Sequence, residues 1–255
     1  MSIKTPKMLK DCKVLVTTGV KGGIGKTFTA FFMADMHSRI MKENVVIINC
    51  DARISSIGTA YRNANDSRVS VVDVPLFDDR SYEEIIKTIE NSRMDFDTKM
   101  PLEEELCPCV IVDMPGQHEG TQHLEFIDVL TDEFDAALLW LIDADVSCID
   151  ALEQARVDGM KPPVPCIAGV DRKAMHQWHR WVQSDVRKAY GYSEKNELWI
   201  EELPSNLLPL MKEDLLAPCV IVNKGHPAVT SLSSRGMSNF MTRFARDVER
   251  VEVLR

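Results

Sequence analysis

Short apolar runs alternate with amphipathic segments along nearly the whole chain of 255 residues. The apolar runs are rich in valine and isoleucine and do not alternate between apolar and polar positions. This pattern predicts strands that are covered on both faces. Such strands are expected at residues 13–18, 45–50, 69–74, 109–113, 136–142, 164–170 and 198–203, and the apolar run 219–222 is a further candidate.

The segments between these runs have the spacing of helices. Phe28, Phe32, Met36 and Ile40 recur every four residues and would give a helix over residues 26–42 one apolar face. Further helices are predicted at residues 82–91, 124–130, 148–157, 173–189, 207–214 and 234–253. Alternating strands and helices predict an α/β fold, with a doubly wound, mostly parallel sheet and helices on both faces. No repeat or linker divides the chain, so we expect one domain over residues 1–255.

The junction of the first strand and the first helix is rich in glycine and lysine. Gly25, Lys26 and Thr27 match the end of the phosphate-binding pattern G-x-x-x-x-G-K-[ST], although Val20 replaces its first glycine. Glycines let backbone N–H groups curl around phosphate oxygens, and the helix N-terminus adds positive partial charge. The residues expected to contact a nucleotide here are Gly22, Gly23, Ile24, Gly25, Lys26, Thr27 and Phe28.

Two aspartates follow predicted strands and are candidates for phosphate chemistry. Asp113 ends a run of four apolar residues, as in a Walker B strand, where the carboxylate holds Mg²⁺ opposite the phosphate loop. The Thr27 hydroxyl is the second candidate metal ligand. Asp51 follows the second strand, where an aspartate more often caps a turn or a helix.

The loop K-G-G-x-G-K-T, with Lys21 before a glycine pair, resembles the deviant phosphate loop of the ParA/MinD family of P-loop ATPases. Asp51 matches the second Asp of that family's Asp-x-Asp-Pro-Gln segment. Pro115 and Gly116, after the Walker B strand, resemble the segment that senses the γ-phosphate.

The resemblance implies a P-loop ATPase that binds ATP and Mg²⁺ and closes into a face-to-face homodimer. Lys21 would reach the partner subunit's phosphates, Lys26 would bind the terminal phosphates, and Asp51 would orient the attacking water. The loop at Pro204 resembles an adenine-side loop and favours a backbone-mediated base site. Residues 170–172 and 223–225 are the competing places for the base.

The implied function is a slow, partner-stimulated ATPase that positions or segregates DNA or plasmid cargo. Its partner would be a DNA-binding adaptor or a cargo protein. Asn49 replaces the family's first Asp, and Ala52 and Arg53 replace Pro-Gln. These departures favour the ParA-like accessory type of plasmid maintenance and conjugative transfer. The alternative is a hydrolysis-poor, ATP-binding regulator or a MinD-like, membrane-associated recruitment protein, and a biosynthetic ligase or reductase is a third possibility.

Charge limits the partners, because a net charge of −9 requires any contact with DNA to come from a local basic patch. Residues 172–188 mix basic residues with tryptophans and could bind non-specific DNA, but the spacing of Met175, Trp178, Val182 and Ala189 favours a core stripe. The apolar face predicted at 235–255 suits either lipid contact or packing on the sheet, and its acidic residues favour packing. It consists of Met237, Met241, Phe244, Val248 and Val251.

The seven cysteines are scattered through the chain, mostly in apolar runs. Only Cys107 and Cys109 are close, and their single-residue spacing does not match the usual metal or redox pair. We therefore expect reduced, structural thiols. The chain shows no secretory signal and no apolar stretch of membrane-spanning length, so we expect a cytoplasmic protein.

Overall fold

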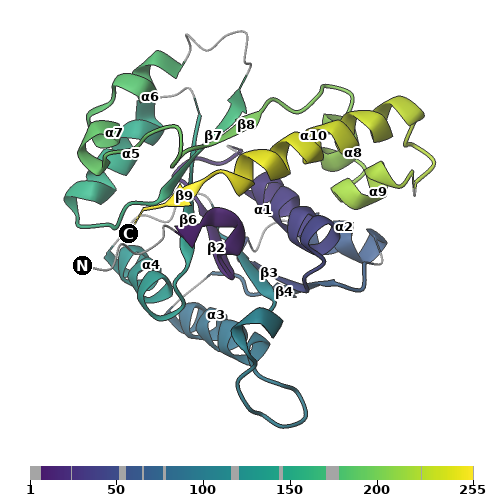
Figure 1. Ribbon diagram of the computed structural model, residues 1–255, viewed down its shortest axis with the longest axis horizontal. Helices are drawn as coiled ribbons and strands as arrows, with labels where there is room; N and C mark the ends of the chain where they lie inside the picture. Colours follow the sequence, from purple (N-terminus) through teal and green to yellow (C-terminus); the bar gives the residue numbers. More distant parts are fainter. Residues whose placement is uncertain are drawn as a thin grey trace.

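A parallel sheet forms the centre of the molecule (Figure 1). The computed structural model describes residues 7–23, 25–51, 56–64, 66–76, 79–115, 121–143, 146–170, 178–224 and 226–254. Within these ranges, seven strands lie in the order β4-β3-β5-β2-β6-β7-β8 and every neighbouring pair is parallel. Their bounds are β2 Val14–Thr18, β3 Val45–Asn49, β4 Val69–Asp73, β5 Cys109–Asp113, β6 Ala137–Ile142, β7 Val164–Val170 and β8 Leu198–Glu201. The prediction of these strands is confirmed, with β8 shorter than expected.

Strand order fixes where a ligand can bind. The chain builds β3, β4 and β5 on one side of β2, and then crosses to the other side with β6. In open parallel sheets, ligands bind beyond the carboxyl ends of the strands where the winding reverses. That point lies at the end of β2, directly before the glycine-rich loop.

Helices lie on both faces of the sheet (Figure 1). Their bounds are α1 Lys26–Asp35, α2 Ser56–Ala64, α3 Asp79–Ser92, α4 Thr121–Glu133, α5 Val146–Val157, α6 His179–Gln183, α7 Asp185–Tyr190, α8 Leu208–Lys212, α9 Pro218–Val222 and α10 Ser231–Glu249. The candidate strand at 219–222 is wrong, because these residues belong to α9. Pro218 fits the first turn of a helix, and a short apolar run does not distinguish a strand from a buried helix.

The first helix is buried on almost every side. Phe31, Met33 and Ala34 are all buried in addition to the predicted Phe32. The expected four-residue stripe fails at Ile40, which is 49% exposed. The reason is that α1 continues as a π-helix over Met36–Met41, whose wider turn rotates the following side chains.

The terminal helix packs on α1 through aromatic rings. The Phe32 ring centroid lies 4.7 Å from that of Phe240 and 5.5 Å from that of Phe244. The apolar face predicted from the sequence is buried, so packing is confirmed for Met237, Met241, Phe244, Val248 and Val251. No helix in the described ranges has the length and apolarity needed to cross a bilayer.

The last helix ends earlier than predicted, at Glu249. The chain then forms β9 (Glu252–Val253), which pairs antiparallel with β1 (Lys7–Met8). The Leu9 N–H also donates to the Val251 carbonyl at 2.8 Å. Both ends of the described chain are thereby joined.

Asp35 is a buried carboxylate at the end of α1. Its Oδ2 lies 3.5 Å from an Arg39 guanidinium nitrogen, and its Oδ1 accepts from the Tyr61 hydroxyl of α2 at 3.5 Å. The Asp35 carboxylate also accepts hydrogen bonds from Cys219 of α9. Burial raises the pKa of Asp35 to about 6, although Arg39 and the Cys219 hydrogen bonds act to lower it.

Replacing Phe240 by alanine should lower the free energy of unfolding by about 3–5 kcal/mol, because it opens a cavity between α10 and α1. Leu232→Ala is the matched control on the same helix. Leu232 is 72% exposed, so its loss should change stability by less than about 0.5 kcal/mol. Urea unfolding of both variants measures the difference, and equal effects would contradict the packing described.

Asp35→Asn should gain stability relative to the unmodified protein as pH rises from 4 to 7. A carboxyl whose pKa is raised on folding supports the fold below its unfolded pKa and loses that support as pH rises through the folded value. Asparagine remains neutral, so the difference in unfolding free energy should shift by on the order of 2 kcal/mol across this interval. Urea unfolding at several pH values measures it, and a difference that stays constant argues against the burial effect.

Candidate functional site

The glycine-rich loop joins β2 to α1 and takes a left-handed backbone at two glycines. Gly23 has φ 76° and Gly25 has φ 104°. Gly25 also occupies the N-cap position of α1, where its carbonyl accepts from the Thr29 N–H at 2.8 Å. The N–H groups of the first helical turn therefore face the loop. Ile24 lies outside the described residues.

The two lysines of the loop have different surroundings. Lys26 is buried, and its Nζ donates to the Lys21 carbonyl at 2.8 Å. Burial lowers the pKa of Lys26, while the carboxylates of Asp113 and Asp51 act to raise it. The Lys21 side chain is 45% exposed at the rim and its Nζ lies 3.0 Å from an oxygen of Asp143, just after β6. One ammonium group thus faces inward and the other lies at the surface.

Asp113, the last residue of β5, lies under the loop. It is fully buried, and its Oδ1 accepts from the Thr17 hydroxyl at 2.9 Å. This contact follows from strand register, because Thr17 of β2 is paired with Asp113. Burial raises the pKa of Asp113 to about 6, against the hydrogen bonds from Thr27 and Thr17 and the charge of Lys26, which lower it. Oxygen ligands of this kind suit Mg²⁺, so Asp113 and Thr27 fit a magnesium site.

Asp51 is held beside the loop by Asn49. The Asp51 N–H donates to the Asn49 side-chain oxygen at 3.3 Å, and the Asn49 amide donates to Asp73 at 2.7 Å. Asn49, which replaces an acidic residue of the ParA/MinD pattern, therefore links the ends of β3 and β4. Ala52, Arg53 and Gly116 lie outside the described residues.

One cavity of about 360 Å³ is bordered by Lys26, Thr27 and Asp51, and its volume lies within the usual range for small-molecule sites. Its phosphate-loop end is lined by Gly22, Gly23, Gly25, Lys26, Thr27 and Asp51. Its other end is lined by Phe28, Phe32, Ala168, Gly169, Ile200, Glu201, Leu203, Leu208 and Lys212. Leu203 lines the cavity directly before Pro204, whereas Pro204 does not. Asn223, the competing base contact, instead accepts from Arg39 at 3.4 Å.

Three residues at or beside the site, Thr17, Asp143 and Glu201, were not predicted from the sequence. Thr17 and Asp143 meet their partners only because β5 and β6 flank β2, and that order is not written in any local motif. Glu201 is one acidic residue among several near the end of β8.

The basic segment expected at 172–188 differs from the prediction. Residues 171–177 lie outside the described residues, and the remainder breaks at Ser184, whose hydroxyl caps α7 by accepting from the Arg187 N–H. Trp178 is buried as expected, but Val182 is 44% exposed and Ala189 is exposed as well. The predicted stripe is therefore wrong at both positions. Trp178 precedes α6 as its N-cap, so it does not share a helical face with Val182, and the break at Ser184 changes the spacing before Ala189.

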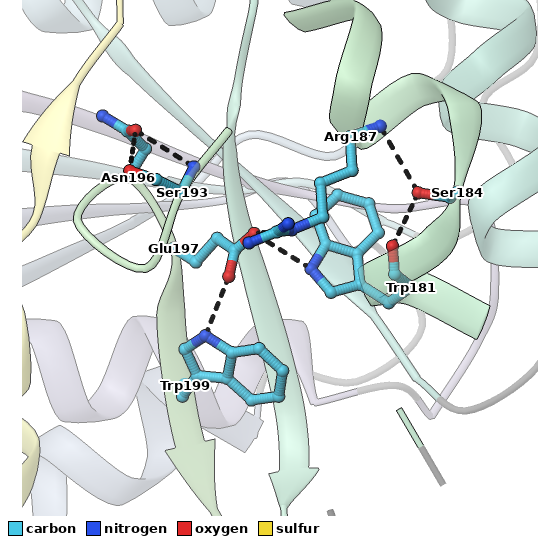
Figure 2. A network of polar contacts seen from close by, with 7 residues as sticks. All are labelled: Trp181, Ser184, Arg187, Ser193, Asn196, Glu197 and Trp199. Carbon is cyan, nitrogen blue, oxygen red and sulfur yellow. Dashed lines mark hydrogen bonds and ion pairs between the residues drawn. The ribbon is translucent and has the colours of Figure 1, made fainter. Parts of the chain in front are cut away.

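The tryptophans of this region do not form a stacking surface. Trp181 is fully buried, and its indole N–H donates to Glu197 at 3.2 Å, while that of Trp199 donates at 3.1 Å (Figure 2). Arg187 Nε binds the same buried carboxylate at 2.6 Å. Trp181, Trp199 and Arg187 are therefore used to satisfy Glu197 inside the protein.

Two solved structures resemble the whole fold. MinD cell division protein from Aquifex aeolicus has a TM-score of 0.50 and 16% identity, over 96% of this chain and 100% of that chain. A protein from Borrelia burgdorferi B31 described as a plasmid partition protein, bound to AMPPNP, has a TM-score of 0.52 and 13% identity, over 93% and 98%. No protein-family model and no curated protein matches the chain. The chain thus shares the fold of these two proteins, and the predicted α/β fold with a parallel sheet is confirmed.

Gly25→Ala should destabilise the free protein by about 1–2 kcal/mol, because a side chain at φ 104° is strained. Gly22→Ala is the matched control. A Cβ there meets nothing within 4 Å and its φ is not in the left-handed region, so stability should stay the same or rise slightly. Urea unfolding without nucleotide compares the two variants, and equal losses would show that the loop backbone is not constrained at Gly25.

Proposed function

We propose that the protein is a Mg²⁺-dependent ATPase of the ParA/MinD type, formed by one domain and active as a nucleotide-dependent homodimer. The observation that carries this proposal is that Lys26, Thr27 and Asp51 line a single cavity, while the buried Asp113 accepts a hydrogen bond from Thr27 and interacts with the charge of Lys26. The cavity runs on from the phosphate loop to a largely apolar end that suits a purine base.

Each group has a distinct task in this proposal. The loop N–H groups and the Lys26 ammonium bind the phosphates, whose negative charge offsets the desolvation of the lysine. Thr27 and Asp113 would hold Mg²⁺, which when bound neutralises charge on the phosphate oxygens. The Asp51 carboxylate lines the cavity. It would accept a hydrogen bond from the attacking water and so orient that water toward the terminal phosphate.

Lys21 supplies the link to a second subunit. Its exposed ammonium group lies at the rim of the site, where it can reach phosphates bound to a partner. There it stabilises negative charge that develops during phosphoryl transfer. Hydrolysis then removes this contact and the two subunits separate. The rate of ATP hydrolysis therefore sets how long the dimer lasts.

We propose that this switch positions or segregates DNA or plasmid cargo, with a DNA-binding adaptor or cargo protein as partner. Asn49 in place of an aspartate favours the accessory type of plasmid maintenance and conjugative transfer. The alternative is a hydrolysis-poor ATP-binding regulator. A membrane-associated, MinD-like role through α10 has less support, because the apolar face of that helix is packed inside the protein.

Steady-state ATPase measurements with duplex DNA, with anionic lipid vesicles and with neither compare these functions. Stimulation by DNA supports cargo positioning, and stimulation by vesicles supports membrane recruitment. A flat, low rate in all conditions supports the regulator.

Lys21→Ala should lower ATP turnover by about 100-fold, the effect of losing one transition-state donor, and should abolish dimerisation with a non-hydrolysable ATP analogue. Lys87→Ala, on the exposed surface of α3, is the control and should change neither quantity. Turnover assays and sedimentation with AMPPNP measure both. A Lys21→Ala protein that still dimerises and hydrolyses ATP at the normal rate excludes the role across the dimer.

A further inference from the structure

The segment between α3 and β5 carries a large share of the exposed apolar surface. Of the ten large hydrophobic side chains that are exposed in the described part of the chain, four lie within residues 94–106, here called the α3–β5 loop. They are Met94, Phe96, Met100 and Leu106, with exposed fractions of 37%, 83%, 63% and 64%. Single exposed apolar residues are normal on any protein, whereas a concentration of them is typical of a surface that contacts a partner.

Hydrogen bonds within the tip of this loop fix its shape. Asp95 Oδ1 accepts from the backbone N–H and the hydroxyl of Thr98, at 2.7 and 2.8 Å, and the Asp95 N–H donates to the Met100 carbonyl at 2.8 Å. The Lys99 ammonium lies 4.6 Å from the centroid of the Phe96 ring. The tip is thus folded by polar contacts while Phe96 remains in water, and a partner that binds it need not order the loop first.

Carboxylates surround this apolar tip. Asp97, Glu103, Glu104 and Glu105 are all exposed, whereas Lys99 is the single basic residue of the α3–β5 loop. An anionic lipid surface repels such a group of charges, and so does the same acidic loop of a second copy of the chain. A basic protein surface attracts it.

The α3–β5 loop lies at the opposite end of the sheet from the phosphate loop. It leads into the start of β5, whereas the phosphate loop follows the end of β2, and the two strands are parallel. Figure 1 shows the chain after α3 extending away from the helices and the sheet. A partner bound there would leave the nucleotide cavity and Lys21 uncovered.

We propose that the α3–β5 loop is a docking surface for a protein that presents an apolar pocket with a rim of lysine or arginine side chains. Phe96 enters the pocket, because a large aromatic side chain at the centre of an interface contributes most to binding. The carboxylates face the basic rim and speed association. The proposal is independent of the ATPase function, since neither the nucleotide nor the dimer takes part in the contact.

Site-specific photo-crosslinking in the cells that make the protein identifies the partner. The photoreactive residue p-benzoylphenylalanine replaces Phe96 in the full chain, and in the matched control it replaces Leu232, which is 72% exposed on α10. We expect a protein to be crosslinked from position 96 and not from position 232. Absence of such a product overturns the proposal, and so does crosslinking from position 96 to a second copy or to lipid.

The partner is then purified and titrated against variants of the full chain. Phe96→Ser should raise the dissociation constant about 30-fold, the effect of losing one aromatic hot spot. Glu103→Lys, Glu104→Lys and Glu105→Lys together should lower the association rate at least about tenfold at low salt, and high salt should remove that difference. Leu232→Ser should change neither quantity.

Phe96 is exposed, so urea unfolding of Phe96→Ser should match that of the unmodified protein. A change in binding therefore reports on the contact and not on the fold. A dissociation constant that Phe96→Ser leaves unchanged, or an association rate that the three lysines leave unchanged, overturns the proposal.

Discussion

The buried carboxylate of Asp113 is the group on which the arrangement of the site depends. A carboxylate without solvent is costly unless donors surround it, and here they come from two separate parts of the chain. The Thr17 hydroxyl comes from the neighbouring strand and Thr27 from the first turn of α1, where the adjacent Lys26 adds its positive charge. These groups hold the sheet and the start of α1 in one fixed relation. The geometry of the phosphate loop therefore depends on the contacts of Asp113 as well as on the glycines of the loop itself.

Much of this could be predicted, because the relevant signals are local. The continuous apolar runs and the sequence of Gly25, Lys26 and Thr27 lie within a few residues of one another, so pattern and spacing are enough to predict the strands, the first helix and the loop. Asp113 was found in the same way, from four apolar residues before it.

The remainder depends on contacts between distant segments or on small changes of helical geometry. Thr17 is an ordinary strand residue until β5 lies beside β2, and Glu201 has no distinguishing neighbour until Arg243 reaches it from α10. Ile40 was misplaced because a π-helix has a different period from the α-helix that the spacing implies. The break at Ser184 likewise shifts Ala189 to the surface. Periodicity assumes uniform geometry, and it fails where one hydroxyl or one wider turn interrupts it.

Phe32 belongs both to the wall of the cavity and to the aromatic cluster under α10. A ligand that displaced this ring would disturb the packing of the terminal helix, so the wall of the cavity and the packing of α10 depend on the same side chain. By thermodynamic reciprocity, a change in α10 that displaced the ring would alter the affinity for that ligand by the same coupling free energy.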